Sequence, residues 1–233
     1  MDKSNNFETY FLISKKRFLI NVYDKQNFKY IFFEEKINDN FCNELNLDLI
    51  NVFLEKNIFK IEKLINDFIK NINLIVESDE FFPIDISIKK NNNGVILEKN
   101  DLIHLLNEAK QNCKNTIQDK KIIHMIIKKY FIDGKKFLFF PDKLRSNSIS
   151  VDIKFDCLPI DYVNKIENIF KNYQIAIKRI LNLSYVESYS DKEGDIVDMA
   201  SKIIEGHNKN EVIIIPKKTN IKGFFERFFN YFS

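Results

Sequence analysis

The chain has 233 residues, of which 45% are hydrophobic and 30% charged, with 36 basic and 33 acidic side chains. This composition is typical of a globular protein with one large or two small domains, and a net charge of +3 does not by itself indicate a nucleic-acid partner. The few glycines are widely scattered and form neither GxGxxG nor GxxxxGK[ST], which argues against the usual phosphate-binding enzymes.

The first part of the chain predicts a β-meander followed by helices. Residues rich in β-branched and aromatic side chains flank the polar turn 24–27. Apolar residues at three- and four-residue spacing then predict an amphipathic helix over residues 58–73. The full set comprises strands at 10–14, 17–23 and 28–34 and helices at 46–57 and 58–73.

A second unit begins after Pro83 with an alternating strand. Asp133-Gly134 is a hairpin signal between two strands. The predicted elements are strands at 84–88, 94–97, 121–132, 137–140, 148–157 and 175–185 and helices at 100–113 and 161–172. Residues 188–195 then form a linker, which a short helix at about 196–204 and an apolar run at 212–215 follow.

Residues 84–186 resemble the inserted SHS2-type subdomain, called 1C, of the bacterial cell-division protein FtsA. The resemblance lies in the order of the elements and in four short motifs. These are Ala109-Lys110 at the end of a helix, Ile123-His124 in a long strand, the Tyr130-x-x-Asp133 segment, and Pro141 before an alternating strand. Residues 10–83 resemble the first part of the actin-like subdomain 1A of FtsA, and the tail resembles its membrane-targeting helix.

The resemblance implies a mixed α/β (α+β) fold in four regions. A partial actin-like layer occupies residues 1–83, and an SHS2-like subdomain with its returning strand occupies 84–187. A linker with a short helix and strand occupies 188–216, and an amphipathic membrane-targeting helix occupies 217–233. The implied function is a cell-division scaffold at the cytoplasmic face of the inner membrane, at the division site. Its partners would be divisome proteins such as FtsZ, or further copies of the same chain.

The sequence departs from FtsA where nucleotide would bind. The actin-like family carries an Asp-x-Gly-[Thr/Ser] loop in its first hairpin, whereas Leu12–Phe18 here contains neither Asp nor Gly. The Gly-rich second half of the ATPase has no counterpart. We therefore expect no enzymatic activity, no catalytic residue and no cofactor. Two alternatives stay open: a PilM-like adaptor for pilus or secretion assembly, and a soluble interaction module whose tail packs on a protein partner.

The last residues carry the clearest functional pattern. At 100° per residue the apolar side chains fall on one helical arc, and basic residues stand where anionic headgroups would lie. The predicted membrane-binding residues are Ile221, Phe224, Phe225, Phe228, Phe229, Tyr231 and Phe232 with Lys217, Lys218, Lys222 and Arg227. The alternative is a terminal helix that packs on the core of the protein itself or on a partner.

Other candidate sites have simpler interpretations. His124 lies among Ile and Met and is interpreted as a packed strand residue rather than a catalytic base. The basic run Ser14–Arg17 is interpreted as a solvated turn rather than a phosphate site, and the Phe28-Lys29-Tyr30 pattern is not taken as a nucleic-acid site. Cys42, Cys113 and Cys157 are far apart in sequence and odd in number, so we expect free buried thiols and no metal. The polar residues 1–6 predict no signal peptide.

Overall fold

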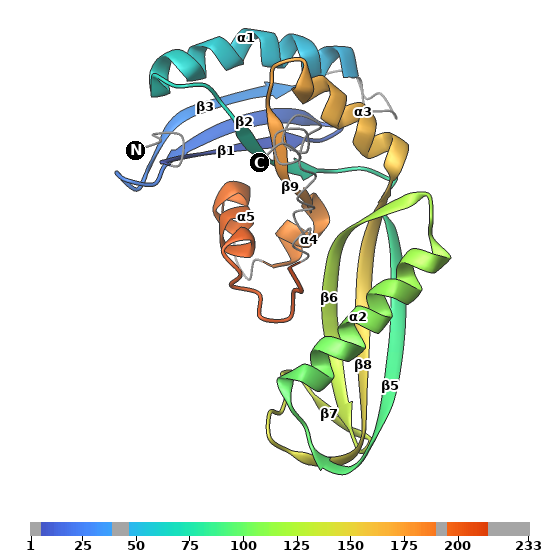
Figure 1. The fold of residues 1–233 in the computed structure, drawn as a ribbon. Coiled ribbons are helices and arrows are strands. Elements are labelled where there is room, and N and C mark those ends of the chain that lie inside the picture. Colours follow the sequence, from blue (N-terminus) through green and yellow to red (C-terminus); the bar gives the residue numbers. More distant parts are fainter. Residues whose placement is uncertain (1–5, 39–46, 190–194, 214–233) are drawn as a thin grey trace, which may run out of the picture.

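The computed structural model describes residues 6–38, 47–189 and 195–213. Within these ranges the chain forms two β-sheets and five helices, which confirms the mixed α/β class expected from the sequence. The two sheets lie in two lobes, with the first sheet at the top of Figure 1 and the second below it. Ends of the second sheet reach the core of the first, because Leu158 and Ile123 pack there.

The first sheet is mixed, with strand order β3-β2-β1-β4-β9. Its three consecutive N-terminal strands are antiparallel, whereas β1 pairs with β4, and β4 with β9, in parallel. The parallel pairs bring together segments that are far apart in sequence. The strands are β1 (Phe7–Ile13), β2 (Arg17–Asp24), β3 (Lys29–Ile37), β4 (Asn71–Val76) and β9 (Ala176–Asn182).

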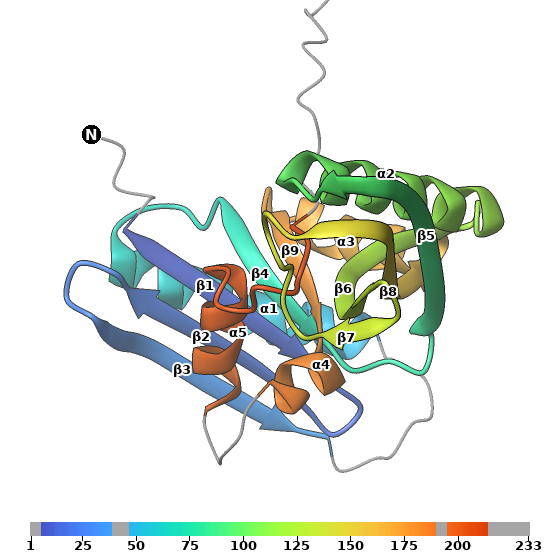
Figure 2. The same ribbon diagram turned by 90° about the horizontal axis from the view of Figure 1, so that it is seen from below.

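Helices cover both faces of this sheet (Figures 1 and 2). The long helices α1 (Leu47–Ile65) and α3 (Ile160–Lys171) lie on one face. The short helices α4 (Leu183–Ser188) and α5 (Ile196–Ile204) lie on the other. Since both faces are covered, β1, β2 and β4 are buried along almost their whole length.

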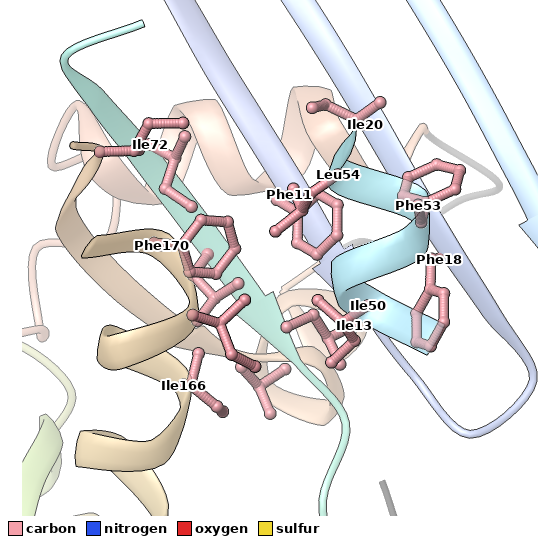
Figure 3. Close-up of a cluster of buried hydrophobic side chains, with 14 of the residues drawn as sticks. Phe11, Ile13, Phe18, Ile20, Ile50, Phe53, Leu54, Ile72, Ile166 and Phe170 are labelled. Carbon is pink, nitrogen blue, oxygen red and sulfur yellow. The ribbon is translucent and has the colours of Figure 1, made fainter. Parts of the chain in front are cut away.

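Aromatic rings dominate the core beneath α1 and α3. Figure 3 shows Phe11 of β1 between Phe53 of α1 and Phe170 of α3. The ring centroids of Phe11 and Phe170 are 5.4 Å apart in an edge-to-face arrangement, and those of Phe11 and Phe53 are 5.9 Å apart. These distances suit the preferred packing of aromatic pairs. Phe11 therefore joins the sheet to both helices that cover it.

A long helix covers only one face of the second sheet, and the opposite face is covered where His124 and Ile126 meet α4 (Leu183–Ser188). The sheet is antiparallel, with order β5-β8-β6-β7, and α2 (Lys99–Thr116) packs against one side of it. The opposite side carries polar contacts, including Ser87 Oγ to Asp152 Oδ1 at 2.7 Å and Lys128 Nζ to Asp85 Oδ1 at 3.0 Å. The strands are β5 (Phe82–Ile96), β6 (Lys120–Ile132), β7 (Lys135–Phe137) and β8 (Arg145–Pro159).

Two sequence predictions for the first lobe are wrong. The helices expected at 46–57 and 58–73 are one helix, α1, which ends at Ile65. Asn66 follows in the left-handed conformation with φ of 51°, a conformation that stops a helix. Ile69 and Ile72 match the helical spacing but lie beyond the helix, and Ile72 is in β4. Similarly, the strand expected at 175–185 ends at Asn182, which caps α4.

Candidate functional site

The predicted membrane-binding residues lie outside the described residues, which end at Ile213. None of the described helices is both long enough and apolar enough to cross a membrane. The structure bears on the tail through residues 207–213, which lead into it. These residues contact the junction between the two lobes, where the described chain has a cluster of buried ionisable side chains.

Glu211 is the centre of this cluster, and its side chain is only 3% exposed. Its Oε1 atom accepts from Nδ1 of His124, at 2.9 Å, and from Nη2 of Arg179, at 2.5 Å. Its Oε2 atom accepts from the hydroxyl of Tyr185 at 3.0 Å. The Tyr185 oxygen in turn accepts from Nδ2 of Asn208 at 2.8 Å. We call these five residues the Glu211 cluster.

The cluster joins both sheets. His124 is on β6 of the second sheet, Arg179 is on β9 of the first, and Tyr185 is on α4. The backbone N–H of Asn182, the last residue of β9, donates to Nε2 of His124 at 3.0 Å. Because Nε2 accepts this bond, the neutral ring carries its proton on Nδ1 and donates it to Glu211. The bonding pattern therefore fixes the tautomer of His124.

Backbone bonds add to this attachment. Residues 210–212 lie antiparallel to the middle of β6, with Glu211 opposite Ile126. The N–H of Ile127 donates to the carbonyl of Asn210, and the N–H of Val212 donates to the carbonyl of Met125, both at 2.8 Å. The last described residues thus extend the second sheet beside β6, and the predicted tail at 217–233 begins five residues after a segment held by backbone and side chain together.

The electrostatics of the cluster favour an ionised Glu211. Burial alone would raise the pKa of its carboxyl, but the hydrogen bond from His124, the charge of Arg179 and the Tyr185 bond hold that pKa below its usual range. The pKa of Tyr185 is raised, first by burial and then by the neighbouring Glu211 charge. Tyr185 therefore stays a neutral donor. A buried carboxylate with three donors is well satisfied.

This arrangement suits a structural role. His124 is 1% exposed, and both of its ring nitrogens have partners inside the protein. A general base needs a free lone pair within reach of substrate, which this ring lacks. The packed-residue interpretation of His124 is thus confirmed. Among the described residues, no group of three or more His, Cys, Asp or Glu side chains is placed to hold a metal.

The hairpin turn predicted at Ser14–Arg17 is present between β1 and β2. Ser14 is 2% exposed, and its N–H and hydroxyl both donate to the carbonyl of Arg17, at 3.0 and 2.9 Å. Two of the basic side chains have acidic partners: Lys15 pairs with Asp79, and Arg17 pairs with Glu35 at 2.7 Å. Ser14 therefore closes the turn by bonding to its backbone, and two of the basic side chains are paired with carboxylates of the first lobe.

A hollow of about 130 Å³ lies at the start of β1 and β4. Glu8 stands among the lysines that line it, at 3.3 Å from Nζ of Lys25 and 3.9 Å from Nζ of Lys178. The acidic side chain therefore offsets part of the positive charge. The hollow has neither the glycine-rich loop nor the size typical of nucleotide sites.

Two of the three cysteines meet in the second lobe. Cys113 on α2 and Cys157 on β8 are free thiols with no exposed surface. Burial, followed by the neighbouring Cys113, raises the pKa of Cys157 to about 12, which keeps it protonated and unreactive. This confirms the expected free buried thiols at these two positions, while Cys42 lies outside the described residues.

Sequence reasoning missed Glu211 as the partner of His124. The two residues are separated by 87 positions, and Glu211 stands in a short polar stretch that resembles a surface turn. The apolar residues after it were the only sign that this stretch joins a sheet. Arg179 was equally hidden, since an arginine in an alternating strand normally faces solvent.

No family model and no curated protein matches this chain. One similar solved structure is the cytoplasmic domain of EpsL, an inner membrane component of the type II secretion system of Vibrio cholerae. The identity is 10% and the TM-score 0.38, and the match covers 80% of this chain and 59% of that chain. Another is a Bacteroides thetaiotaomicron protein with an actin-like ATPase fold and unknown function. The identity is 16% and the TM-score 0.35, over 81% of this chain and 58% of that chain.

This chain therefore spans less than two thirds of the length of either solved structure. The similar structures include an actin-like ATPase fold. The resemblance to FtsA therefore rests on the sequence motifs described above.

Proposed function

We propose that this protein is a non-enzymatic scaffold held at an anionic membrane surface by residues 217–233. The observation that carries the proposal is the attachment of residues 208–212 at the junction of both lobes. A fixed starting point limits how far the folded protein can move from a membrane-bound tail, and the Glu211 cluster fixes that point to β6, β9 and α4 at once.

The sequence of the tail supplies the membrane contact. Complete burial of one Phe side chain contributes roughly 1.5–3 kcal/mol, and an interfacial helix gains part of this for each of its five Phe. Each basic residue near an anionic surface adds about 1 kcal/mol, and salt screens that share. Together these contributions are sufficient for reversible membrane binding.

The partners proposed for the scaffold follow from the FtsA-like motifs. We propose that it organises the division ring at the cytoplasmic face of the inner membrane, by binding divisome proteins such as FtsZ or further copies of itself. Confinement at the membrane raises the effective concentration of the scaffold, so that weak contacts between proteins become sufficient.

Co-sedimentation with anionic vesicles tests the tether. Phe225→Glu with Phe228→Glu places two charges in the apolar arc and should abolish sedimentation at low salt, without a change in melting temperature. The matched control is Phe59→Glu with Phe68→Glu, because these two residues are 73% and 72% exposed on the first lobe. The control should sediment like the wild type. A wild-type protein that stays in the supernatant would disprove the proposal.

Calorimetry with ATP and magnesium tests the non-enzymatic part. We expect no saturable heat up to millimolar nucleotide, because the hairpin loop lacks the Asp and Gly that hold phosphate in actin-like ATPases. A dissociation constant in the micromolar range would contradict this part while leaving the tether intact.

A further inference from the structure

The far end of the second lobe exposes apolar side chains that its core does not use. Phe137 at the end of β7 and Phe140 in the loop between β7 and β8 pack against the α2 core, whereas Leu138 and Phe139 between them are 62% and 61% exposed. A loop that only closed the core would need just the inward pair. Two adjacent large apolar residues left in water gain little from folding, and apolar side chains gathered on one surface are typical of contact sites.

The end of β5 adds to the same surface. The loop and the end of β5 lie side by side at the lower end of the second lobe (Figures 1 and 2), joined by the N–H of Leu97 to the carbonyl of Leu144 at 2.9 Å. Val95 and Ile96 are 61% and 41% exposed, and Leu144 is 39% exposed. We call Val95, Ile96, Leu138, Phe139 and Leu144 the distal apolar surface.

Basic residues are interleaved with these apolar ones. Lys135, Lys136, Lys143 and Arg145 are exposed, and within the described part of the chain none of the four has a carboxylate within 4.0 Å. Of the nearby acids, Asp133 accepts from the N–H groups of Asn147 and Ser148. Asp142 is the other acidic residue of the loop. The four basic side chains therefore give this surface a net positive charge.

We propose that the distal apolar surface is a second membrane contact, which inserts Leu138 and Phe139 among anionic lipids while the lysines bind headgroups. Exposed apolar side chains flanked by basic ones match the apolar and headgroup layers of a lipid interface. The tail of the same chain is a poor occupant, since Lys217, Lys218, Lys222 and Arg227 would repel the basic loop.

The described segment that leads into the tail contacts this surface. Nδ2 of Asn210 donates to the carbonyl of Leu138 at 3.3 Å, and the described chain ends three residues later at Ile213. The seven residues 214–220 can span at most about 23 Å. That reach allows a tail bound at the membrane and the distal loop to contact the same lipid plane, which would orient the protein. The inference therefore rests on the proposed tether.

Tryptophan fluorescence tests the contact, because the chain contains no Trp. In the full chain, Phe139→Trp should shift its emission to shorter wavelength on vesicles of phosphatidylglycerol and phosphatidylcholine. Brominated acyl chains should quench it, and pure phosphatidylcholine should have little effect. The matched control is Phe59→Trp, which is on the first lobe and should not change. Both variants should melt at the wild-type temperature.

The outcomes separate the two proposals. Sedimentation of Phe139→Trp with anionic vesicles without an emission shift would overturn the distal contact and leave the tether standing. An equal shift in Phe59→Trp would indicate non-specific adsorption and would also overturn it. Failure of the wild type to sediment would remove both proposals. Lys135→Gln with Lys136→Gln should weaken vesicle binding, by about fivefold for each charge removed, and unchanged binding would contradict the proposed role of the lysines.

Discussion

The two sheets differ in how fully their faces are covered. The first has helices on both sides, so its central strands are buried at nearly every position. The second has α2 on one side, and its strand β8 alternates between core residues such as Ile153 and polar residues such as Asp152. The comparison teaches that the first lobe is stabilised mainly by apolar burial, whereas the second divides its strands between packing and solvation.

The largest expected effect is a cavity in the first lobe. Phe11→Ala removes the ring that contacts both Phe53 and Phe170 and should lower the free energy of unfolding by about 3–5 kcal/mol. Denaturant titration followed by circular dichroism measures the change. A loss below about 1 kcal/mol would show that this core repacks readily and would weaken the contrast between the sheets.

The next effect tests the junction between the two sheets. Glu211→Ala leaves Arg179 and Tyr185 without their shared acceptor and should cost about 3 kcal/mol, near the lower end of what breaking a buried pair costs, because the Arg179 side chain is 19% exposed. The matched control is Glu205→Ala, because the Glu205 side chain is 60% exposed. Denaturant titration should show almost no change in the control, and equal losses would contradict the structural role of Glu211.

The same cluster predicts a pH dependence. The folded pKa of Glu211 is depressed, so its contribution to stability is present above the unfolded value, near 4.5, and is lost as pH falls through the folded pKa. Its neighbours are His124, Arg179 and Tyr185, and Asp156 lies opposite His124 on β8.

Other carboxylates also titrate in this range, so the difference between two proteins isolates Glu211. Denaturant titrations should show wild type more stable than Glu211→Gln at pH 7, with the gap in unfolding free energy narrowing as the pH falls below 4.5. A gap that stays constant over this range would mean that the charge of Glu211 does not contribute.

The smallest effect is expected on the open face of the second sheet. Ser87→Ala removes an exposed hydrogen bond to Asp152 and should change the free energy of unfolding by less than about 0.5 kcal/mol. The measurement is again denaturant titration. A loss above about 1 kcal/mol would mean that the open face is more than a solvated surface and would narrow the difference between the two sheets.

The difference between the sheets also explains where sequence reasoning succeeded. Residues 148–157 alternate cleanly because one face meets water, and β8 was predicted close to its true position. In the first lobe, burial of both faces removes that alternation. Ile69 and Ile72 then fit a helical spacing as well as a strand, and β4 was missed. The left-handed Asn66 that separates helix from strand is a single residue with no periodic signal.

The candidate site was harder to predict than the fold. The polar partners of His124 come from β9 and the segment after α5, and their proximity depends on how the lobes pack. The Glu211 cluster is formed by residues far apart in sequence, so no local sequence pattern indicates it. The exposed pair Leu138 and Phe139 was equally hidden, because nothing in the run from Phe137 to Phe140 marks which two side chains face the core.

The antiparallel pairing of residues 210–212 with β6 has a mechanical consequence. A force that pulls the tail along the axis of β6 loads the two backbone hydrogen bonds and the side-chain bonds of Glu211 simultaneously, as in shear. A force across the strand would break the same bonds one after another, beginning with that of Val212. The resistance of this attachment therefore depends on the direction of the load, and the protein would hold best when pulled parallel to its second sheet.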